Sequence, residues 1–227
     1  MPQPEAPHKR RLDRRLVLAE AIALADAEGF DALSMRALAT RLGVVPMALY
    51  KHVSDKEDLL GGMVDEIVGG YPTPVAETGW RARVRFRVLA AREALLAHPW
   101  LGRAIDTRGR RTEIVLAHMD AVAGDFIDAG VSPDLTHYAM HALGNRIWGY
   151  STEAFEDADP PTPEDTDRPD VVAHMTERFP HVVAIAMDAA ARNPSGCEQQ
   201  AEFEFTLDLL LDAFARLHTA GWVSRPR

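Results

Sequence analysis

The stretch Ser34-Met-Arg-Ala-Leu-Ala-Thr-Arg-Leu-Gly-Val-Val-Pro-Met-Ala-Leu-Tyr-Lys-His-Val53 decides the fold of this chain. Ser34 can cap a first short helix, because its side chain can accept a hydrogen bond from a free amide of the first turn. Gly43 can end that helix, and a second short helix is expected at about 45–52, where Pro46 fits the first turn. Two short helices joined by a glycine turn predict a helix-turn-helix, whose second helix enters the major groove of DNA.

The side chains of this motif fall into a packed set and an outward set. The apolar positions would fix the two helices against each other and against a preceding helix at 12–28, and they are Leu18, Ile22, Leu38, Ala39, Leu42, Val44 and Leu49. The outward positions, which we expect to contact bases and phosphates, are Pro46, Met47, Ala48, Tyr50, Lys51 and His52. The motif therefore predicts a DNA-binding surface as well as a fold.

Helix is expected almost throughout the rest of the chain, because Ala, Leu, Arg and Glu dominate and alternating β-branched runs are absent. The expected helices are 55–69, opened by a capping box from Ser54 to Glu57, and 80–98, 110–129, 133–156, 171–192 and 199–220. Glycines and prolines from 69 to 74 break the chain. We therefore predict an all-α protein with an N-terminal three-helix helix-turn-helix domain at 1–70, including a mobile arm at 1–10, and a larger helical domain at 71–227.

The charge is distributed unevenly along the chain. The net charge is -9, yet residues 1–60 hold nine Lys or Arg and nine Asp or Glu, while residues 61–227 hold 16 basic and 25 acidic residues. DNA affinity depends on local phosphate neutralisation, so the acidic total does not exclude a DNA partner. The single cysteine, Cys197, excludes an intrachain disulfide and fits a reducing cytoplasm. The sequence offers no apolar run long enough to span a membrane and no signal peptide, so no membrane partner is expected.

Residues 33–60 carry a more specific signal. The positions Leu49, Tyr50, His52, Val53, Lys56, Leu59 and Leu60 follow the pattern Leu-Tyr-x-His-Val/Phe-x-x-Lys-x-x-Leu-Leu. This pattern resembles the TetR (tetracycline repressor) family of bacterial regulators, strongly over about residues 12–68. The remainder resembles the tetracycline-repressor-type C-terminal domain more weakly, through Trp80, residues 93–96 and residues 203–214.

The resemblance implies roles for individual residues in DNA binding. Arg36 is expected to contact phosphate or a base, Tyr50 and His52 the DNA backbone, and Lys56 a phosphate. Met47 and Ala48 are expected at thymine methyls and Lys51 at guanine or phosphate, beside the outward Pro46. Arg10, Arg11 and Arg14 are further candidates for phosphate or minor-groove contacts. The alternatives are that Tyr50 packs the motif and that Lys56 and the N-terminal arginines are only solvated.

The resemblance also assigns effector binding and dimerisation to the second domain. His137, His141, Asn145 and Trp148 share one helix face, so they are candidates for a ligand-binding wall. Further candidate walls are Phe86, Met119, Met175 and Phe179. The alternative is that such an aromatic and methionine stripe is ordinary core. His137 and His141 also fit a metal pair, but the sequence offers no third ligand, so no metal and no cofactor are expected.

The tetracycline-type pocket depends on histidines that coordinate a drug-bound magnesium ion. In register with this family, Ile105 and Asn145 stand where those histidines are expected, and Glu153 keeps a carboxylate. Loss of both imidazoles predicts that tetracycline–magnesium is not the effector. A different, more apolar small molecule is expected instead.

A homodimer is expected through the helices 133–156 and 199–220. The apolar stripe of the last helix would pair with its symmetry mate in a four-helix bundle, and it consists of Phe203, Leu207, Leu210, Leu211, Phe214 and Leu217. A twofold dimer implies a palindromic operator. The alternative is that this stripe packs inside one chain.

Together these features predict a cytoplasmic, ligand-responsive transcriptional regulator that is not an enzyme. The expected mode is a repressor that binds a double-stranded palindromic operator as a homodimer and is released by a small, apolar effector. Two alternatives stay open at this point. One is an all-helical metal-dependent enzyme built on His137 and His141, and the other is a regulator without a small-molecule effector.

Overall fold

The computed structural model describes residues 11–75, 79–107, 111–148, 169–192 and 199–225, apart from the side chains at 148 and 169–172. The expected mobile arm at 1–10 and the carboxylate at Glu153 lie outside these residues. Within the described ranges the secondary structure is helical and contains no strand, which confirms the all-α prediction.

The N-terminal helices begin and end at residues whose side chains or backbone suit those positions. Helix α1 (Arg14–Glu28) is capped by Asp13, which accepts from the Leu16 amide at 2.8 Å, and a 3₁₀ turn (Phe30–Ala32) follows it. Helix α2 (Met35–Leu42) is capped by Ser34 at 3.1 Å. It ends at Gly43, whose φ of 67° is a conformation that glycine adopts without a Cβ penalty. Helix α3 (Pro46–Leu49) follows and is shorter than expected.

Helix α4 (Lys56–Gly69) starts one residue later than predicted, and its cap differs from the capping box expected from Ser54 to Glu57. Asp55 is the cap, accepting from the Asp58 amide at 2.7 Å, and the Asp58 carboxylate reaches back to the Ser54 amide at 2.8 Å. The return bond therefore goes to the residue before the cap, so the arrangement resembles a capping box without being the one expected.

The second part of the chain is built from α5 (Trp80–Ala97), α6 (Leu101–Asp106), α7 (Glu113–Ile127), α8 (Pro133–Trp148) and α12 (Gln199–Thr219). The sequence did not predict α6. The single helix expected at 171–192 is wrong, because the chain forms α10 (Pro169–Arg178) and α11 (Pro180–Arg192) with a break at Phe179. Pro180 explains the break, since a proline disfavours helical backbone at the residue before it.

Two apolar clusters hold the helices together. The first packs α1, α2, α3 and α4 together and includes Trp100, Leu101 and Ala104 at α6. The second joins α5, α7, α8 and α12 around the fully buried Phe126. Burial of apolar surface of this extent is the main favourable contribution to folding.

The apolar stripe of α12 lies inside the chain, contrary to its expected position between two copies. In the second cluster Phe203, Leu207, Leu211 and Phe214 are buried, and Leu210 and Leu217 pack partly against it. This result matches the alternative that the stripe packs within one chain. The apolar side chains that α12 leaves exposed are Phe205 and Leu209.

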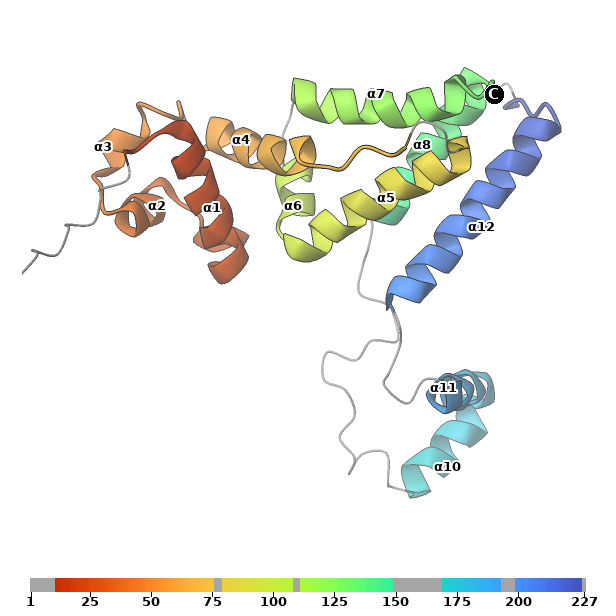
Figure 1. Cartoon of the computed structure of the whole chain (residues 1–227). Helices are drawn as coiled ribbons and strands as arrows, with labels where there is room; N and C mark the ends of the chain where they lie inside the picture. Colours follow the sequence, from red (N-terminus) through yellow and green to blue (C-terminus); the bar gives the residue numbers. More distant parts are fainter. Residues whose placement is uncertain (1–10, 76–78, 108–110, 149–168, 193–198, 226–227) are drawn as a thin grey trace, which may run out of the picture.

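Figure 1 shows how these elements are arranged. Helices α1 to α3 lie at one end of the molecule, and α4 leads from them to the part formed by α5 to α8 and α12. Helices α10 and α11 pack against each other and lie apart from the other helices (Figure 1). Among the described segments, none of the helices has both the length and the apolar content of a membrane span.

Candidate DNA-binding surface and effector cavity

The short helix α3 is anchored by one side chain and exposes the rest. Leu49 is completely buried in the first apolar cluster, together with Leu38 and Ala39 of α2. Met47, by contrast, is 72% exposed, and Tyr50 is 46% exposed. Exposed apolar side chains on a short helix are typical of a binding surface rather than of a core. The helix is therefore fixed to the scaffold on one side and free to meet a partner on the other.

The remaining predicted DNA contacts lie on the same region. Exposed side chains are found at Arg36 on α2, Pro46 on α3, Lys51 in the turn after α3 and Lys56 at the start of α4, and those of Ala48 and His52 are partly exposed. These positions lie on α3 and on the segments before and after it. A helix that contacts bases in the major groove, with phosphate contacts on either side, requires such an arrangement. No metal ion or catalytic group is needed for this surface to bind DNA.

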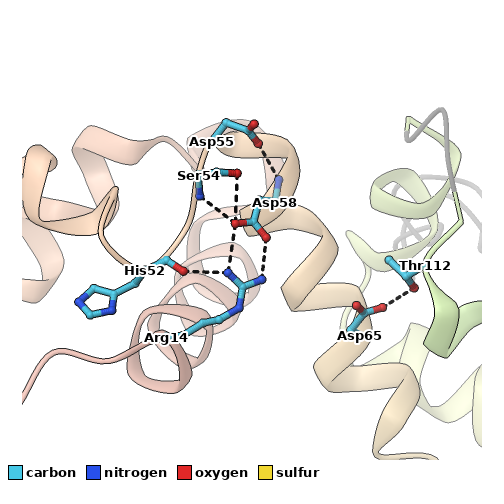
Figure 2. A network of polar contacts seen from close by, with 7 residues as sticks. All are labelled: Arg14, His52, Ser54, Asp55, Asp58, Asp65 and Thr112. Carbon is cyan, nitrogen blue, oxygen red and sulfur yellow. Dashed lines mark hydrogen bonds and ion pairs between the residues drawn. The ribbon is translucent and has the colours of Figure 1, made fainter.

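Arg14 is held within the protein by a network that joins three segments (Figure 2). Its guanidinium donates to the His52 carbonyl at 2.8 Å and to both oxygens of the Asp58 carboxylate at 2.7 and 3.1 Å. The carboxylate also accepts from the Ser54 amide and hydroxyl. The Arg14 hydrogen bond is the main cause that lowers the pKa of Asp58 from 3.8 to about 2. The structure thus gives Arg14 an intramolecular role, and a DNA contact by Arg14 stays a prediction.

The other end of α4 is bonded to α7. The Thr112 hydroxyl donates to the Asp65 carboxylate of α4 (Figure 2). The same hydroxyl accepts from the Val115 amide and so caps α7. Helix α4 is therefore tied by polar contacts at its N-terminal end to α1 and the turn after α3, and near its C-terminal end to α7.

A cavity of about 610 Å³ opens beside this second junction. Its walls come from the end of α4 and from α5, α6, α7 and α8, and they are mostly apolar. The predicted residues that line the cavity are Met119, His137, His141 and Asn145, together with Ile105, the other position of the missing magnesium-binding histidines. A volume of this size and an apolar lining suit a small organic ligand.

Three of the predicted wall residues do not line this cavity in the described structure, and a fourth cannot be placed there. Phe86 is 40% exposed on α5, outside the cavity lining. Met175 and Phe179 are also exposed, at the α10–α11 pair. The side chain of Trp148 lies outside the described side chains. A ligand contact by any of these residues stays a prediction.

The sequence argument missed several polar side chains of the cavity. They are Tyr71, Arg87, Asp106, Arg111, His118 and Thr136. The Tyr71 and His118 rings meet edge to face with centroids 5.0 Å apart. Burial raises the pKa of Tyr71 to about 12, while burial and the nearby Arg87 lower the pKa of His118. Tyr71 follows the glycines that predicted only a chain break, so no periodic signal marked it.

His137 and His141 are close, as their spacing predicts, with ring centroids 4.6 Å apart. Within the described ranges, however, no three His, Cys, Asp or Glu side chains gather in a way that could hold a metal ion. Two imidazoles alone do not make the site of a structural or catalytic zinc ion. The two rings are thus placed as wall residues of the cavity.

Comparison with known proteins agrees with this geometry. Residues 17–63 match the model of bacterial regulatory proteins of the tetR family, and residues 73–217 match the tetracyclin repressor-like C-terminal domain. The tetracycline repressor protein class G of Vibrio anguillarum is 29% identical over 214 residues, which cover 92% of this chain and 97% of that protein.

Solved structures are similar over the same length. A possible TetR family transcriptional regulator from Streptomyces coelicolor A3(2) has a TM-score of 0.70 at 26% identity, covering 90% of this chain and 100% of that chain. BioQ in complex with its natural double-stranded DNA operator has a TM-score of 0.57 at 25% identity, covering 90% of this chain and 99% of that chain.

An exposed helix-turn-helix joined by one helix to a cavity-bearing helical domain defines a transcriptional regulator that binds DNA. The chain belongs to the tetR family of bacterial regulatory proteins, and it is a ligand-responsive, DNA-binding regulator of transcription.

Proposed function

We propose that the protein is a homodimeric repressor that binds a palindromic operator through α3 and is released when a small, mostly apolar effector occupies the cavity. The observation that carries this proposal is the position of the cavity. Val68, in the last turn of α4, and Tyr71, just beyond α4, share its lining with Val115 and His118 of α7. A molecule bound there contacts the helix that also touches the DNA-binding end.

The release step follows from the two junctions of α4. A ligand that wedges between α4 and α7 displaces the C-terminal end of α4, where Asp65 meets Thr112. At the other end, Asp58 passes the displacement to Arg14 and the His52 carbonyl, which borders α3. In a dimer this movement changes the separation of the two copies of α3, so they no longer fit successive major grooves. A ligand shifts the equilibrium between the DNA-binding and the released arrangement only by as much as its affinities for the two arrangements differ.

We place the division between a DNA-binding domain at 1–70 and an effector and dimerisation domain at 71–227. The second domain supplies the dimer contact through α8 and α12. Phe205 and Leu209 of α12 and Tyr138 of α8 are exposed apolar side chains that support this surface. A symmetric contact through them sets two copies of α3 in twofold relation, which requires an inverted repeat in the operator.

This proposal is preferred to the two alternatives left by the sequence. The His137–His141 pair has no third metal-binding side chain among the described residues, which disfavours a metal-dependent enzyme. The roomy apolar cavity favours a small-molecule effector over control by a protein partner alone. We propose that the protein acts on DNA in the cytoplasm and that it is not an enzyme.

Selection from a random pool of double-stranded DNA tests the operator claim, with light scattering of the purified protein to test the dimer. We expect enriched sequences that contain an inverted repeat and a scattering mass of twice the 25.0 kDa chain. Enrichment of sequences without inverted symmetry, or a monomer that binds DNA with full affinity, would contradict the proposal.

A further inference from the structure

Helix α3 and its N-terminal cap carry only apolar side chains. The cap is Val45, and the helix itself consists of Pro46, Met47, Ala48 and Leu49. Leu49 is buried, whereas Val45 and Met47 are 68% and 72% exposed. None of these five side chains has an N–H, an O–H or a carbonyl group. The exposed start of α3 is therefore an apolar surface without strong hydrogen-bonding side chains.

Val45 departs from the rule that the neighbouring helices follow. Helices α1, α2 and α4 are capped by Asp13, Ser34 and Asp55, whose side chains each accept a hydrogen bond from an amide of the first turn. Val45 stands at the same position of α3 and makes no such bond. Packing does not explain the valine either, because its side chain is mostly exposed and belongs to neither apolar cluster. A residue that neither caps the helix nor packs in the core is expected where a contact outside the chain selects it.

The chemistry of the major groove limits what such side chains can recognise. Base pairs differ there in their hydrogen-bond donors and acceptors and in the 5-methyl group of thymine. An aliphatic or thioether side chain gains affinity mainly by covering the methyl group, since this is the apolar group on a base edge. The first residues of a recognition helix are the ones that meet base edges. Val45 and Met47 lie two residues apart, and because consecutive Cα atoms are about 3.8 Å apart and base pairs rise by about 3.4 Å, the two side chains can reach neighbouring base pairs.

We propose that Val45 and Met47 determine operator specificity by binding the 5-methyl groups of two pyrimidines at neighbouring base pairs of each half-site. The inference rests on the proposed function, in which α3 binds the operator. It adds Val45, which the sequence argument left out of the DNA contacts. It also assigns a chemistry to the contact: the methyl group is read, and the hydrogen-bonding groups of the same base are not. At these positions 5-methylcytosine therefore binds more tightly than cytosine, as thymine binds more tightly than uracil.

Base analogues that differ by one methyl group test the inference. A duplex obtained by selection from random double-stranded DNA is labelled, and its dissociation constant from the full chain is measured by fluorescence anisotropy. Each thymine of a half-site is then replaced in turn by uracil. We expect two neighbouring positions at which uracil weakens binding about fourfold, which corresponds to the transfer free energy of one buried methyl group. At the same positions, 5-methylcytosine should bind about fourfold more tightly than cytosine.

Two variants connect each methyl group to one side chain. Val45→Ser and Met47→Gln replace an apolar side chain by a polar one, and each should abolish the uracil effect at one position while the other position keeps it. Serine at 45 can cap α3, so the melting temperature of Val45→Ser should be no lower than that of the wild type. This separates a lost base contact from a damaged fold. Met187→Gln is the matched control, because Met187 of α11 is 67% exposed and lies far along the chain from α3, and it should keep both uracil effects.

The possible failures of the inference and of the proposed function are distinct. A selected duplex that binds specifically but equally well with thymine and with uracil at every position would contradict the inference and leave operator binding in place. The same holds if both uracil effects persist in Val45→Ser and Met47→Gln, or if 5-methylcytosine binds no better than cytosine. Failure to select any specifically bound duplex would contradict the proposed function itself.

Discussion

The Thr112 hydroxyl and the Asp65 carboxylate are hydrogen-bonded, and this contact joins the first turn of α7 to the C-terminal half of α4 (Figure 2). The same hydroxyl oxygen accepts from the Val115 amide at 3.3 Å and so caps α7. One side chain thus stabilises a helix end and connects the cavity wall to the helix that reaches the DNA-binding end. Both consequences can be measured.

We expect Thr112→Val to lower the free energy of unfolding by about 1–2 kcal/mol, because it removes a helix cap and the bond to Asp65. Thr112→Ser should restore most of this loss. Hydrogen exchange should speed up in the first turn of α7 and also near Asp65. The matched control is Ser132→Ala, which removes only the cap that Ser132 gives to Leu135 at 3.2 Å. Ser132→Ala should speed up hydrogen exchange only at α8. Equal exchange rates near Asp65 in the two variants would contradict the proposed connection between Thr112 and α4.

The Arg14–Asp58 ion pair should make stability depend on pH. The pKa of Asp58 falls from 3.8 to about 2 in the folded chain, so its ionised form stabilises the fold above about pH 4. This stabilisation is lost as the pH falls from about 4 to about 2. After allowance for partial exposure of the pair, Asp58→Asn should cost about 1 kcal/mol at pH 7.

Denaturant unfolding of wild type and Asp58→Asn across this range measures the effect. The difference between them should shrink toward zero near pH 2. Asp31→Asn is the control, because the Asp31–Arg103 pair is more exposed than the Arg14–Asp58 pair and should contribute less to stability. A difference that stays constant from pH 7 to pH 2 would show that the Arg14 contact does not hold the charge of Asp58.

Gly43 and Gly124 should respond in opposite ways to replacement by alanine. Gly43 ends α2 with a φ of 67°, where a Cβ is strained although it meets no atom within 4 Å. We expect Gly43→Ala to destabilise the protein by about 1 kcal/mol. Gly124 lies within α7 and a Cβ there also meets nothing within 4 Å, so Gly124→Ala should stabilise by up to about 1 kcal/mol. Thermal unfolding of both variants checks the pair, and a shift in the same direction would be inconsistent with this account of the turn.

Lys51 is exposed in the turn that follows α3, and the sequence left open whether it meets guanine or phosphate. If it neutralises one phosphate, Lys51→Ala should weaken binding to all duplexes and reduce the slope of log affinity against log salt by about 0.9. Arg216→Ala, at an exposed cation of α12, should change neither quantity. An unchanged slope with lost preference for one base pair would assign Lys51 to a base instead.

The sequence predicted the helix-turn-helix well because this motif depends on local signals. Ser34, Gly43 and Pro46 act within one turn of their own positions, and each stands in the structure as the pattern indicates. The burial of Leu38 and Leu49 follows from helical spacing in the same way. The side chains exposed around α3 are those that the same spacing leaves out of the core.

Features that depend on distant contacts were missed or misplaced. The α12 stripe was assigned to a dimer because periodicity identifies an apolar face but not the surface that covers it. The cavity residue Tyr71 stands in a segment without periodicity, and its partner His118 lies 47 positions away. The bond from Arg14 to Asp58 spans 44 positions, so no sequence window contains both.

Binding of the purified protein to the DNA upstream of its own gene tests the central claim most directly. The measurement is fluorescence anisotropy of a labelled duplex, repeated at rising salt concentration and with Tyr50→Ala and Lys51→Ala together as the control protein. The account predicts specific binding that weakens steeply with salt and is lost in the control. The absence of salt-sensitive binding to this DNA and to any palindrome obtained by selection would contradict it.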